Sequence, residues 1–253
     1  MSEAIFCTVG HSGAMPFAHK ILTEHGFFLT NRKDPDVTHL LLPVPSFEKD
    51  GRIKGGGVLE HILADLPDNI TIIGGNLAHP ALMGYRKIDL LEDPAYLIQN
   101  SAITADCAIQ VIKNHLSVEF DDCVAMIIGW GRIGKCLSTQ LKTLGCQVTV
   151  AARKESDRQA LQTLGFTGIS IEEIPVHLQE AHLVINTVPA TILDTNQCSC
   201  HRGDTIFIEL ASLPGIVGTD VIQALGLPGK YAPEASGNLI AQTILRHIKE
   251  VHP

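Results

Sequence analysis

The sequence Cys123-Val-Ala-Met-Ile-Ile-Gly-Trp-Gly-Arg-Ile-Gly134 decides the fold, because it joins an apolar run to a glycine-rich turn and then to a helical pattern that extends to Leu144. A buried strand that turns directly into a helix is typical of dinucleotide-binding folds. Gly129 allows the sharp turn, Gly131 lets backbone N–H groups approach a pyrophosphate, and Gly134 lets the helix lie close to the sheet. The free N–H groups at the helix start can then bind the phosphates without any side chain.

The segment Val148–Lys154, which follows as a second strand and its end, predicts the coenzyme. In NAD sites an acidic residue at the end of this strand accepts a hydrogen bond from the ribose 2′-hydroxyl. Here Ala152 stands at that position, and Arg153 and Lys154 follow it. A guanidinium beside the ribose binds a 2′-phosphate well, so we predict NADP (NADPH) as the coenzyme. The alternative is that the two basic residues are merely solvated.

Composition indicates a globular protein of two modest α/β domains. The chain has 253 residues, 45% hydrophobic residues and a net charge of −8, and its 19 Lys and Arg residues are scattered rather than clustered. This pattern argues against nucleic acid as a partner. No apolar run approaches the roughly 20 residues of a membrane helix, and the apolar patch near the start ends at Gly10, which is too short for a signal peptide. We expect a cytoplasmic protein with no membrane contact.

The seven cysteines do not indicate disulfides, because their number is odd and several fall in predicted strands and helices. Cys198-Ser-Cys200-His201 offers three potential metal ligands at close spacing. No distant pair of ligands completes a zinc site, so we predict no metal.

The first hundred residues alternate between strand and helix signals, which predicts a smaller, mostly parallel sheet covered by helices. The expected elements are Ala4–Val9, Pro16–His25, Val37–Val44, Gly57–Leu66, Ile70–Ile73 and Lys87–Leu91. Ligands of such sheets lie beyond the carboxyl ends of the strands. The loops Gly10–Gly13, after Ala4–Val9, and Pro43–Ser46, at the end of Val37–Val44, are therefore expected to line a cleft.

Other loops of this domain, together with the loop after the first strand, supply candidate substrate and catalytic residues. Arg52 and Lys54 stand just before a predicted helix and suit an anionic substrate group, although exposed basic loops are usually only solvated. Of the twelve histidines, His11 and His79 are the catalytic candidates, because each lies in a Gly- or Pro-flanked loop where an imidazole can reach a substrate.

Residues Asn100–Asp106 carry capping side chains and an acid, so we predict that a helix starts at Asn100. This helix is expected to bridge the domains, with Asn100 and Thr104 contacting the substrate or the nicotinamide, or acting only as caps. Thr104 is also a candidate catalytic residue. The predicted organisation is an N-terminal substrate or cap domain at residues 1–99, the bridging helix with a Rossmann domain at 100–235, and a C-terminal helix at 236–253 that packs back across the domain junction.

Two further buried strands end in small or polar residues at the carboxyl edge, where a nicotinamide ribose would lie. Leu183–Asn186 leads into Thr187-Val188-Pro189, and Thr205–Leu210 leads into Ala211-Ser212. The predicted coenzyme-binding residues are Gly129, Gly131, Arg132, Ile133, Gly134, Arg153, Lys154, Asn186, Thr187, Pro189, Ala211 and Ser212.

The ordered set of motifs resembles the family formed by the A subunits of dipicolinate synthase from spore-forming bacteria. The resemblance rests on NSAITAD (100–106), IIGWGRIGK (127–135), VTVAARK (148–154), INTVPATIL (185–193), LASLPG (210–215) and LPGKYAPEASG (227–237). It spans about residue 37 to the end. Two departures are an N-terminal domain shorter than the family's and Ile216-Val217-Gly218, which stand as an insertion.

The resemblance implies an oxidoreductase in which NADP⁺ accepts a hydride from dihydro- or hydroxytetrahydro-dipicolinate, a small dicarboxylate, during sporulation. It also implies that a second, flavoprotein-like B subunit is a partner, and we expect a homo-oligomer. One alternative is a D-2-hydroxy-acid dehydrogenase-like enzyme, although Leu210–Gly218 lacks that family's Arg. Another is a non-catalytic NADPH-binding sensor.

Overall fold

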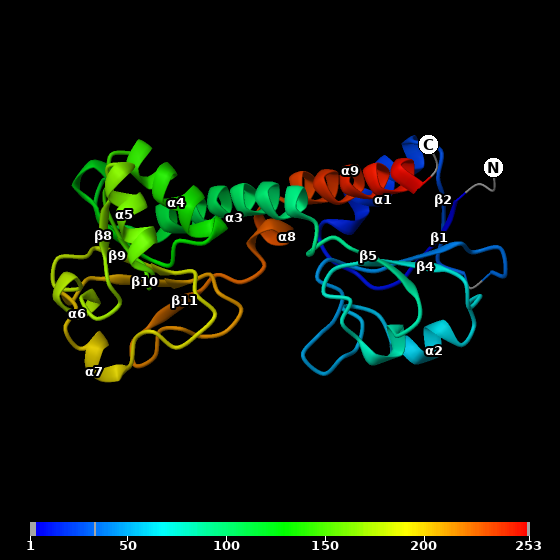
Figure 1. Cartoon of the computed structure of the whole chain (residues 1–253), viewed down its shortest axis with the longest axis horizontal. Helices are drawn as coiled ribbons and strands as arrows, with labels where there is room; N and C mark the ends of the chain where they lie inside the picture. Colours follow the sequence, from blue (N-terminus) through cyan, green and yellow to red (C-terminus); the bar gives the residue numbers. More distant parts are fainter. Residues whose placement is uncertain (1–3, 33, 252–253) are drawn as a thin grey trace. The chain divides into compact units, whose positions relative to one another are not determined.

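Two all-parallel sheets carry the fold, one in each of the two units into which the chain divides. The structure is a computed structural model that describes residues 4–32 and 34–251. The first unit comprises the chain up to Ile103 and from Pro228 onward, and the second comprises Thr104–Leu227. Helices cover the sheets, as Figure 1 shows for each unit. The predicted α/β fold with a doubly wound Rossmann-type sheet and a second α/β domain is confirmed, and the smaller sheet of that second domain has five strands against six.

The sheet of the first unit has the strand order β2-β1-β3-β4-β5. Its strands are β1 (Ile5–Thr8), β2 (Phe28–Thr30), β3 (His39–Leu41), β4 (Thr71–Gly74) and β5 (Arg86–Asp89). In this doubly wound order the direction of winding reverses between β1 and β3, and such switch points create a crevice at the carboxyl edge.

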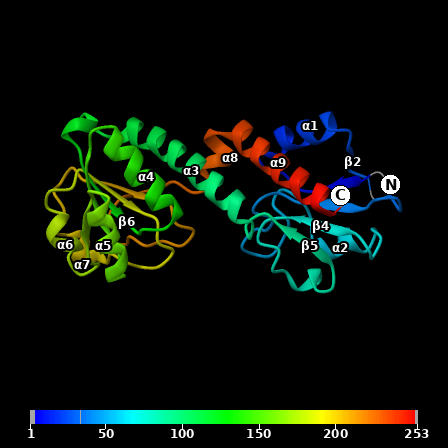
Figure 2. The same cartoon turned by 45° about the horizontal axis from the view of Figure 1, so that its top comes forward.

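The first unit buries both faces of its sheet because successive side chains of each strand point to opposite faces. Phe6 contributes to a core with α1 (Met15–Glu24) and α9 (Pro233–Val251), whereas Cys7 contributes to a core with α2 (Leu59–Leu63). Helices α1 and α9 lie side by side in both views (Figures 1 and 2). A Cβ atom at Gly237 of α9 would lie 2.5 Å from the Ala14 carbonyl oxygen, so glycine permits this close approach.

The sheet of the second unit has the order β11-β10-β9-β6-β7-β8. Its strands are β6 (Val124–Ile128), β7 (Gln147–Ala151), β8 (Thr167–Ile169), β9 (Leu183–Asn186), β10 (Ile206–Glu209) and β11 (Val221–Gln223). Numbered from β6, this is the 3-2-1-4-5-6 order of the Rossmann fold, with its switch point between β6 and β9. The glycine-rich turn follows β6 and therefore lies at the switch point.

Helices of the second unit pack on both faces of this sheet. On one face α4 (Arg132–Thr143) lies beside α3 (Pro94–His115), and Gln140 Nε2 of α4 donates to Asp106 Oδ1 of α3 at 2.5 Å. The other face buries Met126, Val184 and Phe207 with residues of α6 (Ile174–His177) and α7 (Thr195–Cys198). Helix α5 (Glu155–Thr163) packs beside β8.

The bridging helix α3 begins at Pro94, so the prediction that it starts at Asn100 is wrong. Asp93 Oδ1 accepts from the Tyr96 N–H at 2.8 Å, and Pro94 occupies the first helical position, where its missing N–H is tolerated. Ser101, expected to be a cap, donates instead to the Leu97 carbonyl inside the helix.

Several short elements were not predicted from the sequence. They are β2, β11, α7, α8 (Leu227–Tyr231) and the 3₁₀ turns η1 (Pro80–Leu82) and η2 (Phe120–Asp122). The C-terminal helix begins at Pro233 rather than Ser236, and it belongs to the first unit.

Asp93 also joins α3 to α9 within the first unit. Its buried Oδ2 lies 2.8 Å from both Arg246 Nη2 and His247 Nε2. Burial alone would raise the pKa of this carboxyl, but hydrogen bonds from the Tyr96 N–H, Arg246 and His247 lower the pKa to about 2. The charged form is therefore favoured in the folded state.

We predict that Asp93→Asn lowers the free energy of unfolding at pH 7 by about 2 to 3 kcal/mol, because a depressed pKa in the folded state stabilises it. This contribution is present above the pKa of an unfolded Asp, about 4. It is lost as the pH falls through the folded-state pKa of about 2. Urea unfolding at pH 7 and pH 3 should show the difference from wild type shrinking at the lower pH.

Glu92→Gln is the matched control, because Glu92 precedes Asp93 but is exposed. It should leave unfolding at both pH values close to wild type. An equal loss in both variants, or a loss in Asp93→Asn that does not change with pH, would contradict this account.

Candidate functional site

The turn after β6 and the start of α4 depend on two glycines, Gly129 and Gly134, at positions where a side chain would collide with neighbouring atoms. Gly129 has a φ of 108°, and a Cβ there would lie 2.5 Å from Thr187 Oγ1. A Cβ at Gly134 would lie 2.2 Å from the Gly129 carbonyl oxygen. Side chains at these positions would push α4 away from the sheet edge, so both glycines fix how closely the helix starts beside the strand.

Gly131 differs, because neither its backbone nor its packing requires glycine. Its φ is −80°, and a Cβ there would meet no atom within 4 Å. It is the N-cap of α4, where no side chain caps the helix and no acid lies in the first turn, while Arg132 is exposed and Ile133 half-buried. The positive end of α4 therefore has no side-chain cap and has open space beside Gly131, which fits a dinucleotide pyrophosphate.

The end of β7 presents cations where the ribose of a bound dinucleotide is expected. Ala152 is buried, while Arg153 and Lys154 are exposed. Arg158 of α5 supports the turn, because its Nη1 donates to the carbonyl oxygens of Ala152 at 2.8 Å and Arg153 at 3.0 Å. The Nη2 atom of Arg158 pairs with Glu155.

The loop after β9 lies against the glycine turn. Thr187 Oγ1 donates to the Ile128 carbonyl at 2.9 Å, which joins this loop to the end of β6. Asn186 is fully buried, and its amide bonds to the backbone of Val188 and to Glu209. Its side chain is therefore engaged within the protein, whereas Pro189 is exposed at the sheet edge.

Glu209, which the sequence reasoning missed, ends β10 next to this loop. It is fully buried, and its carboxylate accepts from Asn186 Nδ2 at 2.8 Å, the Ala211 N–H at 3.0 Å and the Gly215 N–H at 2.7 Å. Ala211 is buried and Ser212 exposed. An acidic residue inside an otherwise apolar strand was the signal that could have found this group.

In the first unit the structure brings His11 and Lys54 together at the switch point. The backbone N–H of His11 donates to the Lys54 carbonyl oxygen at 2.8 Å. A Cβ at Gly10 would lie 2.5 Å from that oxygen. The loop that carries Lys54 thus packs on the loop after β1. Arg52 is exposed and pairs with Asp50, which is also exposed, at 2.8 Å.

His79 has a structural contact in the first unit. Its Nδ1 accepts from the Ala81 N–H at 3.2 Å, which caps η1, and its ring lies 4.9 Å from that of Phe47. On α3, Asn100 is half-buried and Thr104 is 8% exposed, and both interact with neighbouring residues.

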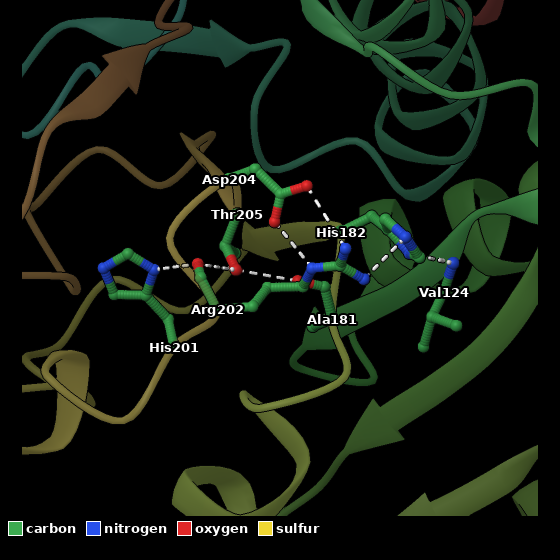
Figure 3. Close-up of polar contacts among 7 residues, drawn as sticks. All are labelled: Val124, Ala181, His182, His201, Arg202, Asp204 and Thr205. Atoms are coloured by element: carbon green, nitrogen blue, oxygen red, sulfur yellow. Dashed lines mark hydrogen bonds and ion pairs between the residues drawn. The ribbon is translucent and has the colours of Figure 1, made fainter.

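A second polar cluster lies at the opposite, amino edge of the second sheet (Figure 3). His182 Nδ1 accepts from the Val124 N–H at 3.1 Å, and Arg202 Nη1 lies 2.7 Å from His182 Nε2. Arg202 also pairs with Asp204, and Thr205 Oγ1 donates to the Ala181 carbonyl at 2.7 Å (Figure 3). These contacts join the starts of β6, β9 and β10.

The Cys198-Ser-Cys200-His201 segment is spread over different environments. Cys198 is buried, Cys200 is exposed, and the His201 ring packs edge-on against Phe207. Among residues 4–32 and 34–251, no group of three or more His, Cys, Asp or Glu residues is placed to hold a metal ion. Across the same described ranges, no helix is both long and apolar enough to span a membrane.

Comparisons with known proteins agree with this geometry. The A subunit of dipicolinate synthase from Bacillus subtilis (strain 168) is 28% identical over 186 residues, which cover 69% of this chain and 62% of that protein's length. The crystal structure of the Bacillus halodurans A subunit superposes with a TM-score of 0.85, 20% identity and 98% coverage of both chains. The Bacillus subtilis crystal structure gives 0.84 and 21%, covering 99% of this chain and 97% of that one. The resemblance to the A subunits of dipicolinate synthase is confirmed.

The family model for the D-isomer specific 2-hydroxyacid dehydrogenase, NAD binding domain, matches residues 99–225. This range is half of the chain and contains the glycine turn, the end of β7 and the loops after β9 and β10. The chain thus belongs, through this domain, to the D-isomer specific 2-hydroxyacid dehydrogenase family.

Proposed function

We propose that the protein is an NADP-dependent oxidoreductase subunit that forms dipicolinate from dihydro- or hydroxytetrahydro-dipicolinate. The observation that carries the coenzyme part is the open space at Gly131, at the uncapped start of α4. The substrate part is supported by the motifs and by the name of the similar protein, the A subunit of dipicolinate synthase. The word subunit in that name also supports a partner protein, which we propose is flavoprotein-like. We further propose that the protein is homo-oligomeric and cytoplasmic and that it acts in sporulation.

The coenzyme, when bound, would supply the acceptor for a hydride, and aromatisation of the ring provides the driving force. Dihydrodipicolinate also loses one proton, and a hydroxytetrahydro substrate must in addition lose one water molecule. The protein's task is then to orient and hold charged groups rather than to act as a nucleophile. The start of α4 binds the pyrophosphate through N–H groups and the helix dipole. Arg153 and Lys154 bind the 2′-phosphate, and the loops after β9 and β10 shape the nicotinamide end.

For the substrate we propose that Lys54 or Arg52 binds a carboxylate and that Asn100 or Thr104 makes a further polar contact. The backbone bond that seats Lys54 beside His11 supports Lys54 as the stronger of the two cations. Arg52 is already paired with Asp50 at the surface, so it is less suited than Lys54 to bind a substrate carboxylate. His11 is exposed beside Lys54 and remains the proposed proton acceptor, in preference to His79, whose Nδ1 is engaged with Ala81.

The reaction is tested by mixing the protein with NADP⁺ and dihydrodipicolinate, with and without a flavoprotein partner, and following NADPH absorbance. Turnover supports the proposal. Tight NADPH binding without turnover in either mixture would favour the sensor, and oxidation of a D-2-hydroxy acid in place of dihydrodipicolinate would favour the related dehydrogenase.

We predict that the wild type binds NADPH more tightly than NADH by roughly 10- to 150-fold, or about 1.5 to 3 kcal/mol, because a guanidinium pairs with the 2′-phosphate. Arg153→Ala should weaken NADPH binding and leave NADH binding nearly unchanged. Titration of both coenzymes at fixed ionic strength measures this, and Arg86→Ala, an exposed Arg of β5, is the control. Equal affinities of the wild type for NADPH and NADH would contradict the assignment of NADP as the coenzyme.

We also predict that Lys54→Ala lowers kcat/KM by roughly 10- to 100-fold, since a charge-assisted hydrogen bond contributes about 1.5 to 3 kcal/mol. Thr104→Ala and Arg52→Ala should lower it less. Steady-state kinetics provides the measurement, with Lys49→Ala as an exposed control from the same loop. Unchanged kcat/KM in all three test variants would show that the substrate is held elsewhere.

A further inference from the structure

Glu209 is a buried acid whose hydrogen-bond partners are all amide N–H groups. Its Oε1 accepts from Asn186 Nδ2 at 2.8 Å and from the Ala211 N–H at 3.0 Å, and its Oε2 accepts from the Gly215 N–H at 2.7 Å. Ala211 and Gly215 bracket the exposed segment Ser212–Pro214. Both ends of that segment are therefore tied to one carboxylate.

Asn186 holds the backbone of the neighbouring loop, the loop after β9, in a similar way. Its Oδ1 accepts from the Val188 N–H at 3.1 Å, and its Nδ2 donates to the Val188 carbonyl at 2.9 Å as well as to Glu209. The next residue, Thr187, is held by Ile128 and lies against Gly129. A chain of contacts thus runs from the glycine turn through Asn186 to Glu209.

Gly215 closes the arrangement. Its carbonyl oxygen accepts from the N–H groups of Ile192 at 2.8 Å and Leu193 at 3.0 Å. A Cβ at this position would lie 2.1 Å from Asn186 Nδ2. The loops after β9 and β10 are consequently seated on each other through Asn186, Glu209 and Gly215.

The network formed by Asn186, Glu209 and Gly215 lies where packing alone does not account for a buried acid. A buried carboxylate is costly unless it is fully hydrogen-bonded, and an apolar side chain would fill the core at less cost. At the amino edge of β10 the acid Asp204 is exposed and pairs with the cation Arg202. At the carboxyl edge, where ligands of such sheets bind, the acid instead holds loop backbone.

We propose that Glu209 and Asn186 are positioning residues for the nicotinamide half of the coenzyme. They hold the exposed segments at Pro189-Ala190 and Ser212–Pro214 in the shape that receives the nicotinamide and its ribose. The inference rests on the proposed coenzyme function. Neither side chain touches the coenzyme, because both are fully buried.

The test separates the two halves of the coenzyme in the full-length protein. Glu209→Gln keeps the shape but replaces an acceptor oxygen by an NH₂ group, which would face N–H donors. Because an unsatisfied buried donor is unfavourable, NADPH binding should weaken by roughly 10-fold or more, or kcat should fall by as much. Binding of adenosine 2′,5′-bisphosphate, which lacks the nicotinamide half, should stay within about 2-fold of wild type.

Glu209→Asp retains the charge but shortens the side chain, and it serves if Glu209→Gln does not fold. It should show the same split between NADPH and the bisphosphate. Asn186→Ala combined with Glu209→Gln should weaken NADPH binding by less than the product of the two single effects, because both act through one contact. Asp204→Asn, at the other end of β10, is the control and should leave both affinities unchanged.

Equal weakening of NADPH and bisphosphate together with a lower Tm would overturn the proposal, since it would indicate a general structural role. Unchanged NADPH affinity and kcat in a folded Glu209 variant would overturn it too. A wild-type protein that binds neither ligand would overturn the coenzyme function itself, and the positioning role with it.

Discussion

The carbonyl oxygen of Gly129 leaves no room for a side chain at position 134, in the first turn of α4. A Cβ at Gly134 would lie 2.2 Å from that oxygen, so the helix can start at the sheet edge only because residue 134 is glycine. That closeness places the positive end of α4 at the switch point between β6 and β9. It also brings Thr187 against the turn, and through Asn186 it reaches Glu209 and the loop after β10.

Much of the fold could be predicted from the sequence because long buried strands and amphipathic helices carry their own patterns. The runs at Cys123–Ile128 and Leu183–Asn186 were identified this way, and the structure has strands there. Strands β2 and β11 have three residues each and none of them is buried, whereas the equally short β3 lies within the longer apolar run Val37–Val44. The start of α3 was misplaced because Asn100 and Ser101 are capping residue types, although Asp93-Pro94 carries the actual cap.

The candidate site was only partly accessible from the sequence. The glycine motif is one contiguous segment and the basic residues after β7 are another, so the arrangement within each follows from local geometry. The pairing of Asn186 with Glu209 joins positions 23 residues apart and depends on which strands are neighbours. Similarly, the seating of Lys54 beside His11 depends on how one loop packs on another, and no local pattern contains that information.

Arg158 has a consequence for how coenzyme use could change during evolution. Its guanidinium is fixed by the carbonyl oxygens of Ala152 and Arg153, so a cation stays at the end of β7 whichever residue occupies position 153. An acid introduced at position 152 to recognise an unphosphorylated ribose would stand next to that fixed charge and be partly neutralised by it. A lineage that moved toward NAD would therefore have to alter α5 as well as the strand end, so the preference for NADP that we propose would depend on two elements rather than on one residue.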